Sequence, residues 1–145
     1  MIGSALRHTS DDKLAAGLRI FLGLLFVMTG VMKLVVPMLA EAWSGQLLAA
    51  QLPLYEVNVR LVPFVEIAVG AVLLIGVYTR LACLTVIGIM VVATYVHVVV
   101  DDPSLFPLQP NEPVIPLIVI AMSGYLIWKG GGAGSLDLKA GGTAV

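Results

Sequence analysis

Four long apolar segments constrain this chain more than any other feature of its sequence. They cover residues 14–36, 59–78, 81–100 and 113–128, and the third reads LACLTVIGIMVVATYVHVVV. A helix needs about 20 apolar residues to cross the hydrocarbon core of a bilayer. Lipid offers no hydrogen-bond partner to a backbone, so each segment is expected to be helical. We therefore predict an all-α fold, a bundle of four transmembrane helices.

The overall composition agrees with a membrane environment. Hydrophobic residues make up 59% of the 145 residues and charged residues only 12%, against about 25% charged in ordinary globular proteins. The length fits a single domain, which we place at residues 14–128. The formal net charge is −1 and no basic cluster is present, so nucleic acid is not an expected partner. The expected partner is the lipid bilayer.

The distribution of positive charge predicts the orientation of the chain. Six of the eight lysines and arginines fall on the side that holds both termini: Arg7, Lys13, Arg19, Arg80, Lys129 and Lys139. Positive residues favour the cytoplasmic side. We therefore expect a plasma (inner) membrane protein of a bacterium, with a cytoplasmic segment at residues 1–13 and a flexible, glycine-rich cytoplasmic tail at residues 129–145. Arg19 and Arg80 are predicted to anchor the inner face by binding lipid headgroups, and Arg80 could also bind the carbonyl end of the second span.

The two outer loops differ in character. The first contains MLAEAWSGQLLAAQL at residues 38–52, which is predicted to form a short amphipathic helix at the outer interface with Trp43 as its anchor. A partly ordered loop is the alternative. The second, DDPSLFPLQPNEP at residues 101–113, is rich in proline and is expected to be extended.

Five ionisable residues from all four spans are predicted to share the outer layer of the membrane. They are Lys33, Glu66, His97, Asp101 and Glu112. Glu66 lies six residues beyond Arg60, which places it roughly 9 Å deep at 1.5 Å per residue. His97 and Asp101 are spaced to share a helical face, and small residues beside Lys33 and Glu66 permit close helix packing. The prediction is a polar pocket that opens toward the outer leaflet.

The role of this pocket stays open at the level of sequence. Ionisable groups inside a membrane are costly and often functional, so Glu66 is expected to pair with Lys33 or to carry a proton. The pair could serve only to hold two helices together, and Lys33 alone could reach the headgroups. A quinone needs a hydrogen-bond donor and a proton relay, which His97 with Asp101 or Glu66 could supply. A metal on His97, Asp101 and Glu112 is the weaker alternative, because no ligand-spacing motif is present.

A single cysteine limits the redox chemistry available to the chain. Cys83 has no partner for a disulfide, and the sequence contains no CxxC motif. Its surroundings, LACLTVIG, predict a packed apolar thiol. We expect no cofactor held by the chain itself other than a possible quinone.

Several stretches resemble the DoxX family of small integral membrane proteins. The similar stretches are RIFLGLLFVMTGVMKL, VEIAVGAVLLIGVYTRLACL, HVVVDDPSLFPLQPNEP and GGGAGSLD, which together run from about Arg19 to Asp137. The resemblance implies four membrane helices and a role beside partner proteins in redox chemistry, as in the DoxD-type subunit of thiosulfate:quinone oxidoreductase. By position, Lys33, Glu66, Arg80 and Glu112 match family motifs. Some relatives carry a cysteine pair, and this chain has only Cys83.

Two functions of different classes follow from these observations. The first is a membrane subunit of a redox complex that binds a quinone or another lipid-soluble ligand in the outer pocket. The second is a non-catalytic accessory subunit that packs against a larger membrane complex. A small-solute carrier is a minor third reading, because the sequence shows no inverted repeat. Catalysis by the chain alone is not expected, since it contains no complete redox centre.

Overall fold

The computed structural model describes residues 7–101 and 110–141, and within these ranges the chain is helical without any strand. The helices are α2 (Lys13–Val35), α3 (Pro37–Ala49), α4 (Tyr55–Ile75), α5 (Thr79–Val99), α6 (Val114–Lys129) and α7 (Leu136–Gly141). Three of these, α2, α4 and α5, are long and apolar enough to cross a membrane, and α6 is a shorter apolar helix. The all-α prediction is confirmed. The predicted loop at residues 101–113 falls largely outside the described residues.

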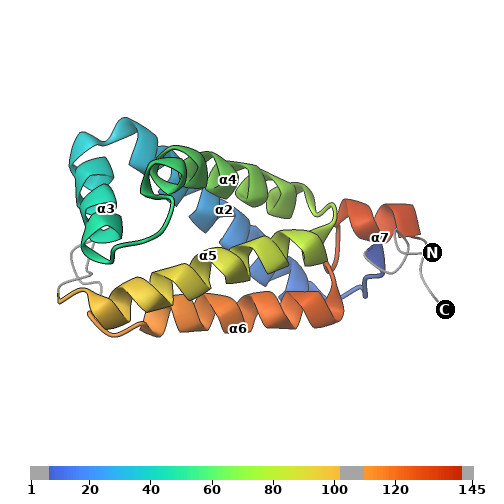
Figure 1. The fold of residues 1–145 in the computed structure, drawn as a ribbon. Coiled ribbons are helices and arrows are strands. Elements are labelled where there is room, and N and C mark those ends of the chain that lie inside the picture. The colour runs from blue at the N-terminus through green and yellow to red at the C-terminus, as the bar shows by residue number, and fades with distance from the viewer. Residues whose placement is uncertain (1–6, 102–109, 142–145) are drawn as a thin grey trace.

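The helices form two closely packed pairs, α2 with α4 and α5 with α6. Figure 1 shows the two pairs approaching each other at the end that holds α7 and lying apart at the opposite end, where α3 crosses the bundle. We call these the terminal end and the α3 end. Arg7 and α7 lie together at the terminal end, so the described chain begins and finishes on one side.

Glycines allow α2 and α4 to touch along their backbones. A Cβ atom added to Gly30 would lie 2.7 Å from the carbonyl oxygen of Pro63, and one added to Gly70 would lie 2.7 Å from that of Gly23. Only a residue without a side chain fits such a contact. The close helix approach expected from the small residues is therefore confirmed.

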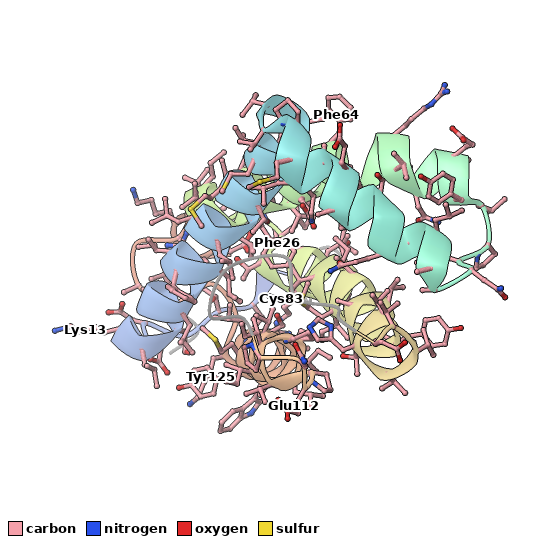
Figure 2. All side chains as sticks on the ribbon, turned by 90° about the vertical axis from the view of Figure 1, so that its left-hand side faces the viewer. Lys13, Phe26, Phe64, Cys83, Glu112 and Tyr125 are labelled. Carbon is pink, nitrogen blue, oxygen red and sulfur yellow. The ribbon has the colours of Figure 1, made fainter. Side chains whose placement is uncertain are left out.

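Apolar side chains occupy both the inside and the outside of the bundle. The core contains Leu22, Phe26, Leu73, Val86 and Leu126, together with Cys83, which is fully buried as predicted. Large apolar side chains such as Phe64 lie on the outer surface of the helices (Figure 2). An apolar exterior over an apolar core is what a bilayer solvent requires.

The second span begins and ends earlier in the chain than the sequence predicts. The prediction is residues 59–78, whereas α4 runs Tyr55–Ile75. Gly76 ends the helix because it adopts a left-handed φ of +74°, and its N–H donates to the carbonyl of Val72 at 2.9 Å. This is the usual glycine stop of a helix, and it overrides the apolar residues that follow.

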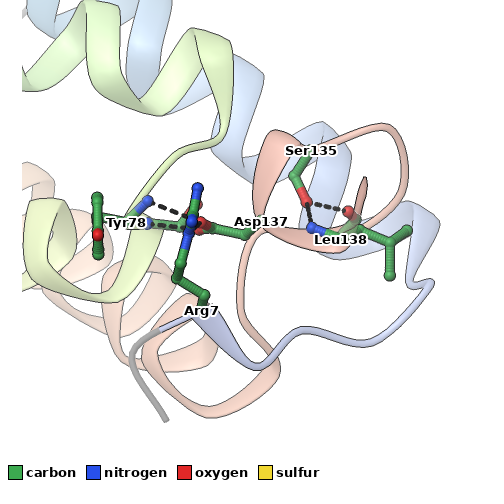
Figure 3. A network of polar contacts seen from close by, with 7 residues as sticks. Arg7, Tyr78, Ser135, Asp137 and Leu138 are labelled. Atoms are coloured by element: carbon green, nitrogen blue, oxygen red, sulfur yellow. Dashed lines mark hydrogen bonds and ion pairs between the residues drawn. The ribbon is translucent and has the colours of Figure 1, made fainter. Parts of the chain in front are cut away.

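The prediction of a flexible tail at residues 129–145 is wrong for the part that the structure describes. Residues 130–141 fold back on the terminal end, and Ser135 and Asp137 are buried there. The Asp137 carboxylate accepts hydrogen bonds from the N–H groups of Tyr78 and Thr79 at 2.9 and 3.0 Å, and pairs with Arg7 at 3.3 Å (Figure 3). It therefore caps the start of α5, where unpaired N–H groups attract negative charge.

The two inner-face arginines bind carbonyl groups of the protein. Arg19 is buried and donates to the carbonyls of Gly131, Leu73 and Leu74 at 2.6–2.7 Å. A headgroup anchor needs an exposed side chain, so that prediction is wrong for Arg19. Arg80 donates to the carbonyl of Trp128 at 3.3 Å. Arg80 thus contacts the carbonyl end of α6. The contact with the carbonyl end of the second span that the sequence suggests stays a prediction.

Candidate ligand cavity

A cavity of about 690 Å³ lies where the two helix pairs diverge. Its volume falls within the roughly 300–1,000 Å³ typical of small-molecule sites. Five helices line it with mostly apolar side chains, and its polar lining residues are Thr29, Lys33, Gln46, Asn58, Glu66 and His97. On α2, Leu25 and Phe26 line its deeper part, while Lys33 lies two turns closer to α3. The cavity is thus apolar toward the middle of the bundle and polar toward the α3 end.

The predicted pair of Lys33 and Glu66 is present in the cavity wall. Lys33 Nζ lies 2.6 Å from Glu66 Oε1, and their side chains are 11% and 3% exposed. The same ammonium lies 4.9 Å from the centre of the Trp43 ring, a cation–π contact. Lys33 is therefore held between α4 and α3, and the snorkelling role considered for it does not describe its position.

The second oxygen of the Glu66 carboxylate, Oε2, is buried and makes no hydrogen bond among the described residues. The Thr29 hydroxyl, whose own bond goes to the carbonyl of Phe26, is also placed to interact with this carboxylate. A buried acceptor left without a donor costs about 1–3 kcal/mol. A bound water, an ion, a ligand or a proton could each supply the missing partner of such a group.

His97 lines the same cavity from α5. Its Nδ1 lies 2.8 Å from the carbonyl oxygen of Ala93, one turn earlier on the helix. A carbonyl can only accept, so Nδ1 carries the proton and donates it. In a neutral ring Nε2 is then an acceptor. The imidazole is half-buried, and this local bond contributes to its orientation.

Asp101 and Glu112 do not join this site. Both are exposed, and neither lines the cavity. Helix α5 ends at Val99 and Val100 is already extended, so Asp101 does not continue the helical face of His97. Glu112 lies in the turn before α6. The structure brings Lys33, Glu66 and His97 together in one cavity and leaves Asp101 and Glu112 outside it. The common depth in the membrane that the sequence predicts for all five stays a prediction.

Helix α3 supplies cavity residues that the sequence did not assign to the site. Trp43, Gln46 and Leu47 line the cavity at the α3 end. The sequence had indicated a helix here with Trp43 anchored at the membrane surface, yet Trp43 contacts Lys33 and packs beside Leu47. The available signal was the spacing of Trp43, Gln46 and Leu47, which share one helical face. Asn58, from the first turn of α4, was also missed.

The described residues contain no group of three or more histidine, cysteine, aspartate or glutamate side chains placed to hold a metal ion. Cys83 lies in the main core and is not a lining residue of the cavity. The polar groups that line the cavity are an ion pair, an imidazole, two side-chain amides and the Thr29 hydroxyl.

The fold and this cavity define a helical integral membrane protein with an internal apolar chamber. The DoxX family model matches residues 14–99, which is more than half of the chain, so the protein belongs to the DoxX family. The matched range contains Lys33, Glu66 and His97, and it stops before the proline-rich loop and the glycine-rich segment that also resemble the family. Neither a search of curated proteins nor one of solved structures gave a match.

Proposed function

We propose that this DoxX-family protein is a membrane subunit of a redox assembly and that it binds a quinone-like molecule in the cavity between its two helix pairs. One observation carries the proposal. The cavity combines a mainly apolar wall with a buried carboxylate, Glu66, one oxygen of which makes no hydrogen bond to any residue that the structure describes. A lipid-soluble ligand with a polar ring matches both features.

The polar residues suit the chemistry of a quinone head. Reduction or oxidation of a quinone moves protons together with electrons, and a carboxylate and an imidazole are suitable carriers of those protons. Glu66 and His97 would serve this role, and the Lys33 ammonium would orient a ring oxygen. The electrons would come from a partner protein, because the sequence has one cysteine and therefore no dithiol pair.

The proposed placement in the membrane follows the positive charges. Arg7, Lys129 and Lys139 lie toward the terminal end, which favours this end as the cytoplasmic one. Helix α6 would complete four spans, and α3 would lie at the outer surface of a bacterial inner membrane. The polar part of the cavity would then lie near the outer leaflet.

Tryptophan fluorescence offers a direct test. The sequence has two tryptophans, Trp43 in the cavity wall and Trp128, which is 70% exposed. In a Trp128→Phe background, the short-chain quinone decylubiquinone should quench Trp43 in a saturable way. The Trp43→Phe protein, which keeps Trp128, reports quenching by quinone dissolved in the lipid. Quenching that rises without saturation, and equally in both proteins, would overturn the proposal.

A matched pair of glutamate variants then tests the site itself. Glu66→Gln should abolish the saturable quenching while the protein keeps its helical circular dichroism spectrum. Glu56→Gln is the control, because Glu56 lies on the same helix with a side chain that is 74% exposed. Native mass spectrometry of the assembly from mildly solubilised membranes gives an independent readout. It should show a small lipid-soluble ligand that is missing from Glu66→Gln alone.

A non-catalytic accessory subunit is the second candidate, favoured by the tight contact of α2 and α4. The Lys33–Glu66 pair joins these two helices beside the backbone contact of Gly30 with Pro63, so it could act purely as a clasp. In that case Glu66→Gln lowers stability, removes no ligand, and leaves a fixed set of partner chains in the native mass spectrum.

A further inference from the structure

The seam between α2 and α6 differs from the other boundaries of the cavity. Met28 of α2 and Ile115 of α6 both line the cavity, yet they are 53% and 43% exposed on the outside of the bundle. Each of the two facing helices therefore contributes a side chain that touches both the chamber and the surroundings. Met32 also lines the cavity, between Met28 and Lys33 on α2. Methionine side chains are flexible and adapt readily to a bound ligand.

The described residues hold the α2–α6 seam together from the terminal end as far as the inner end of the cavity. Tyr125 of α6 donates a hydrogen bond of 2.8 Å to Asp12, which precedes α2 at the terminal end. Phe26 of α2 and Val119 of α6, which line the inner end of the cavity, belong to the same buried core cluster. Between these two residues and α3, neither core cluster contains a residue of α2 or α6 in the part of the chain that the structure describes, so the two helices are held together at the terminal end and at the inner end of the cavity.

The opposite seam, between α4 and α5, is closed at both ends. The short connection around Gly76 joins the helices at the terminal end. At the α3 end a small apolar cluster of Leu47, Ala50 and Val96 packs with Tyr55 and Val59 and so joins α3, α4 and α5. Val92 and Gly88 of α5 are exposed lining residues here, but the α4 lining residues Val62 and Asn58 are half-buried.

Helix α3 covers the polar end of the chamber. Trp43, Gln46 and Leu47 line the cavity from this side, and Lys33 is held against the Trp43 ring. In Figure 2, which looks toward the α3 end, α3 crosses in front of the bundle. A large zwitterionic headgroup would have to give up its water beneath this helix, which is costly without a full set of partners. A compact head with few polar atoms would lose less water there, so its binding would cost less.

We propose that the cavity is entered sideways from the bilayer through the α2–α6 seam, and that its ligand is an amphiphile with a compact polar head under α3 and an apolar tail lying in the seam between Met28 and Ile115. This inference rests on the proposed function and deepens it. A cavity of this kind would bind tailed lipids with a compact head, such as quinones, in preference to phospholipids and to water-soluble solutes. The head would meet Glu66 and His97, and the tail would follow the apolar gradient toward the middle of the membrane.

The test compares a tailed and a tail-less quinone on the same protein. Decylubiquinone and its tail-less analogue ubiquinone-0 are titrated against Trp43 fluorescence in the Trp128→Phe protein. The double variant Met28→Phe with Ile115→Phe fills the seam. It should lower the affinity for the tailed quinone relative to the tail-less one by about tenfold, equivalent to about 1.4 kcal/mol.

The matched control is Leu24→Phe with Leu117→Phe, on the same two helices. Both residues are more than half exposed and neither lines the cavity, so the affinity ratio should not change. An unchanged ratio in the seam variant would overturn the seam assignment. A Val92→Phe variant that lowers this affinity ratio, when the seam variant does not, would also overturn the assignment. That result would place the tail between α4 and α5.

The head is tested separately with phosphatidylethanolamine, whose headgroup is zwitterionic. Adding this phospholipid to detergent-solubilised protein should leave the saturable quenching unchanged, and competition at the affinity of the quinone would overturn the compact-head assignment. These failures are distinguishable from failure of the proposed function. If the proposed function is wrong, the protein with the unmodified seam shows no saturable quenching of Trp43 by either quinone.

Discussion

Lys33 Nζ lies 2.6 Å from Glu66 Oε1 across 33 residues of sequence, and this contact joins the second half of α2 to the middle of α4. Both side chains are almost fully buried. Removing one partner of such a pair leaves an uncompensated charge, whereas replacing both by apolar residues is often neutral or stabilising. The structural and the ligand-binding roles of the pair can therefore be separated by mutation.

We expect Glu66→Leu alone to lower the free energy of unfolding by about 3–5 kcal/mol, because Lys33 is left without its counter-ion. The double variant Lys33→Met with Glu66→Leu should recover most of this loss. Both proteins should fail to bind quinone. Thermal unfolding in detergent, followed by circular dichroism, measures the stability. A double variant as unstable as the single one would contradict this account of the pair.

Gly30→Ala should separate α2 from α4. The new Cβ would lie 2.7 Å from the carbonyl oxygen of Pro63 and 2.8 Å from a side-chain carbon of Ile67, and overpacking of this kind costs about 1–3 kcal/mol. Gly17→Ala is the control on the same helix, because nothing lies within 4 Å of its added Cβ. It should be neutral or stabilising by up to about 1 kcal/mol, since alanine is the better helix former. Equal melting temperatures for the two variants would argue against the close contact.

Arg19→Lys should be destabilising despite the retained charge. The guanidinium binds the carbonyls of Leu73, Leu74 and Gly131 at once, and a lysine cannot reproduce this fork. The loss of charge-assisted hydrogen bonds to buried carbonyls corresponds to about 1–3 kcal/mol. Arg60→Lys is the control, because its side chain is 82% exposed. An Arg19→Lys protein as stable as the Arg60→Lys protein would mean that the carbonyls find other partners.

The core of the fold could be predicted because the bilayer imposes it. Apolar segments of about 20 residues leave few alternatives to helices, and the Lys33–Glu66 pair followed from two charges at matching depth on neighbouring helices. The terminal end could not be predicted in the same way. Glycines in the segment after α6 resemble a flexible linker, and only the tertiary structure shows that Asp137 reaches the unpaired N–H groups of α5.

The cavity was predictable in part for a related reason. Lys33, Glu66 and His97 lie within helices, where depth can be counted along the axis. Asp101 and Glu112 lie beyond helix ends, where the chain turns and the count no longer holds. The contribution of Trp43 and Gln46 depends on α3 folding over the bundle, which no local pattern specifies.

Asp137→Ala should loosen the terminal end. The carboxylate caps α5 and holds the backbone of Tyr78, which has a strained φ of +47°. Loss of a helix cap costs about 0.5–2 kcal/mol. Trypsin should then cut after Lys129 and Lys139 faster than in the unmodified protein, as followed by mass spectrometry. Asp11→Ala, at an exposed position before α2, should leave the cutting rate unchanged, and equal acceleration in both variants would contradict the capping role.

Acid should weaken the terminal end through Asp12. Its carboxylate accepts hydrogen bonds from the N–H groups of Ala15 and Leu14 and from the Tyr125 hydroxyl. These bonds, that of Ala15 foremost, hold the pKa of Asp12 below its ordinary value of 3.8. A depressed pKa in the folded state means that unfolding takes up protons as the pH falls below this ordinary value. The contribution of Asp12 to stability is therefore complete above about pH 5 and is lost as the pH falls through its folded pKa.

The Asp12→Asn variant isolates this contribution from that of the other acids. Its melting temperature should be lower than that of the unmodified protein at pH 6, and the difference should shrink as the pH is lowered toward 3. Asp11→Asn is the control, because Asp11 is exposed and is not the capping residue of α2. A difference between Asp12→Asn and the unmodified protein that stays constant over this pH range would show that the carboxylate is not held in its charged form by the helix and by Tyr125.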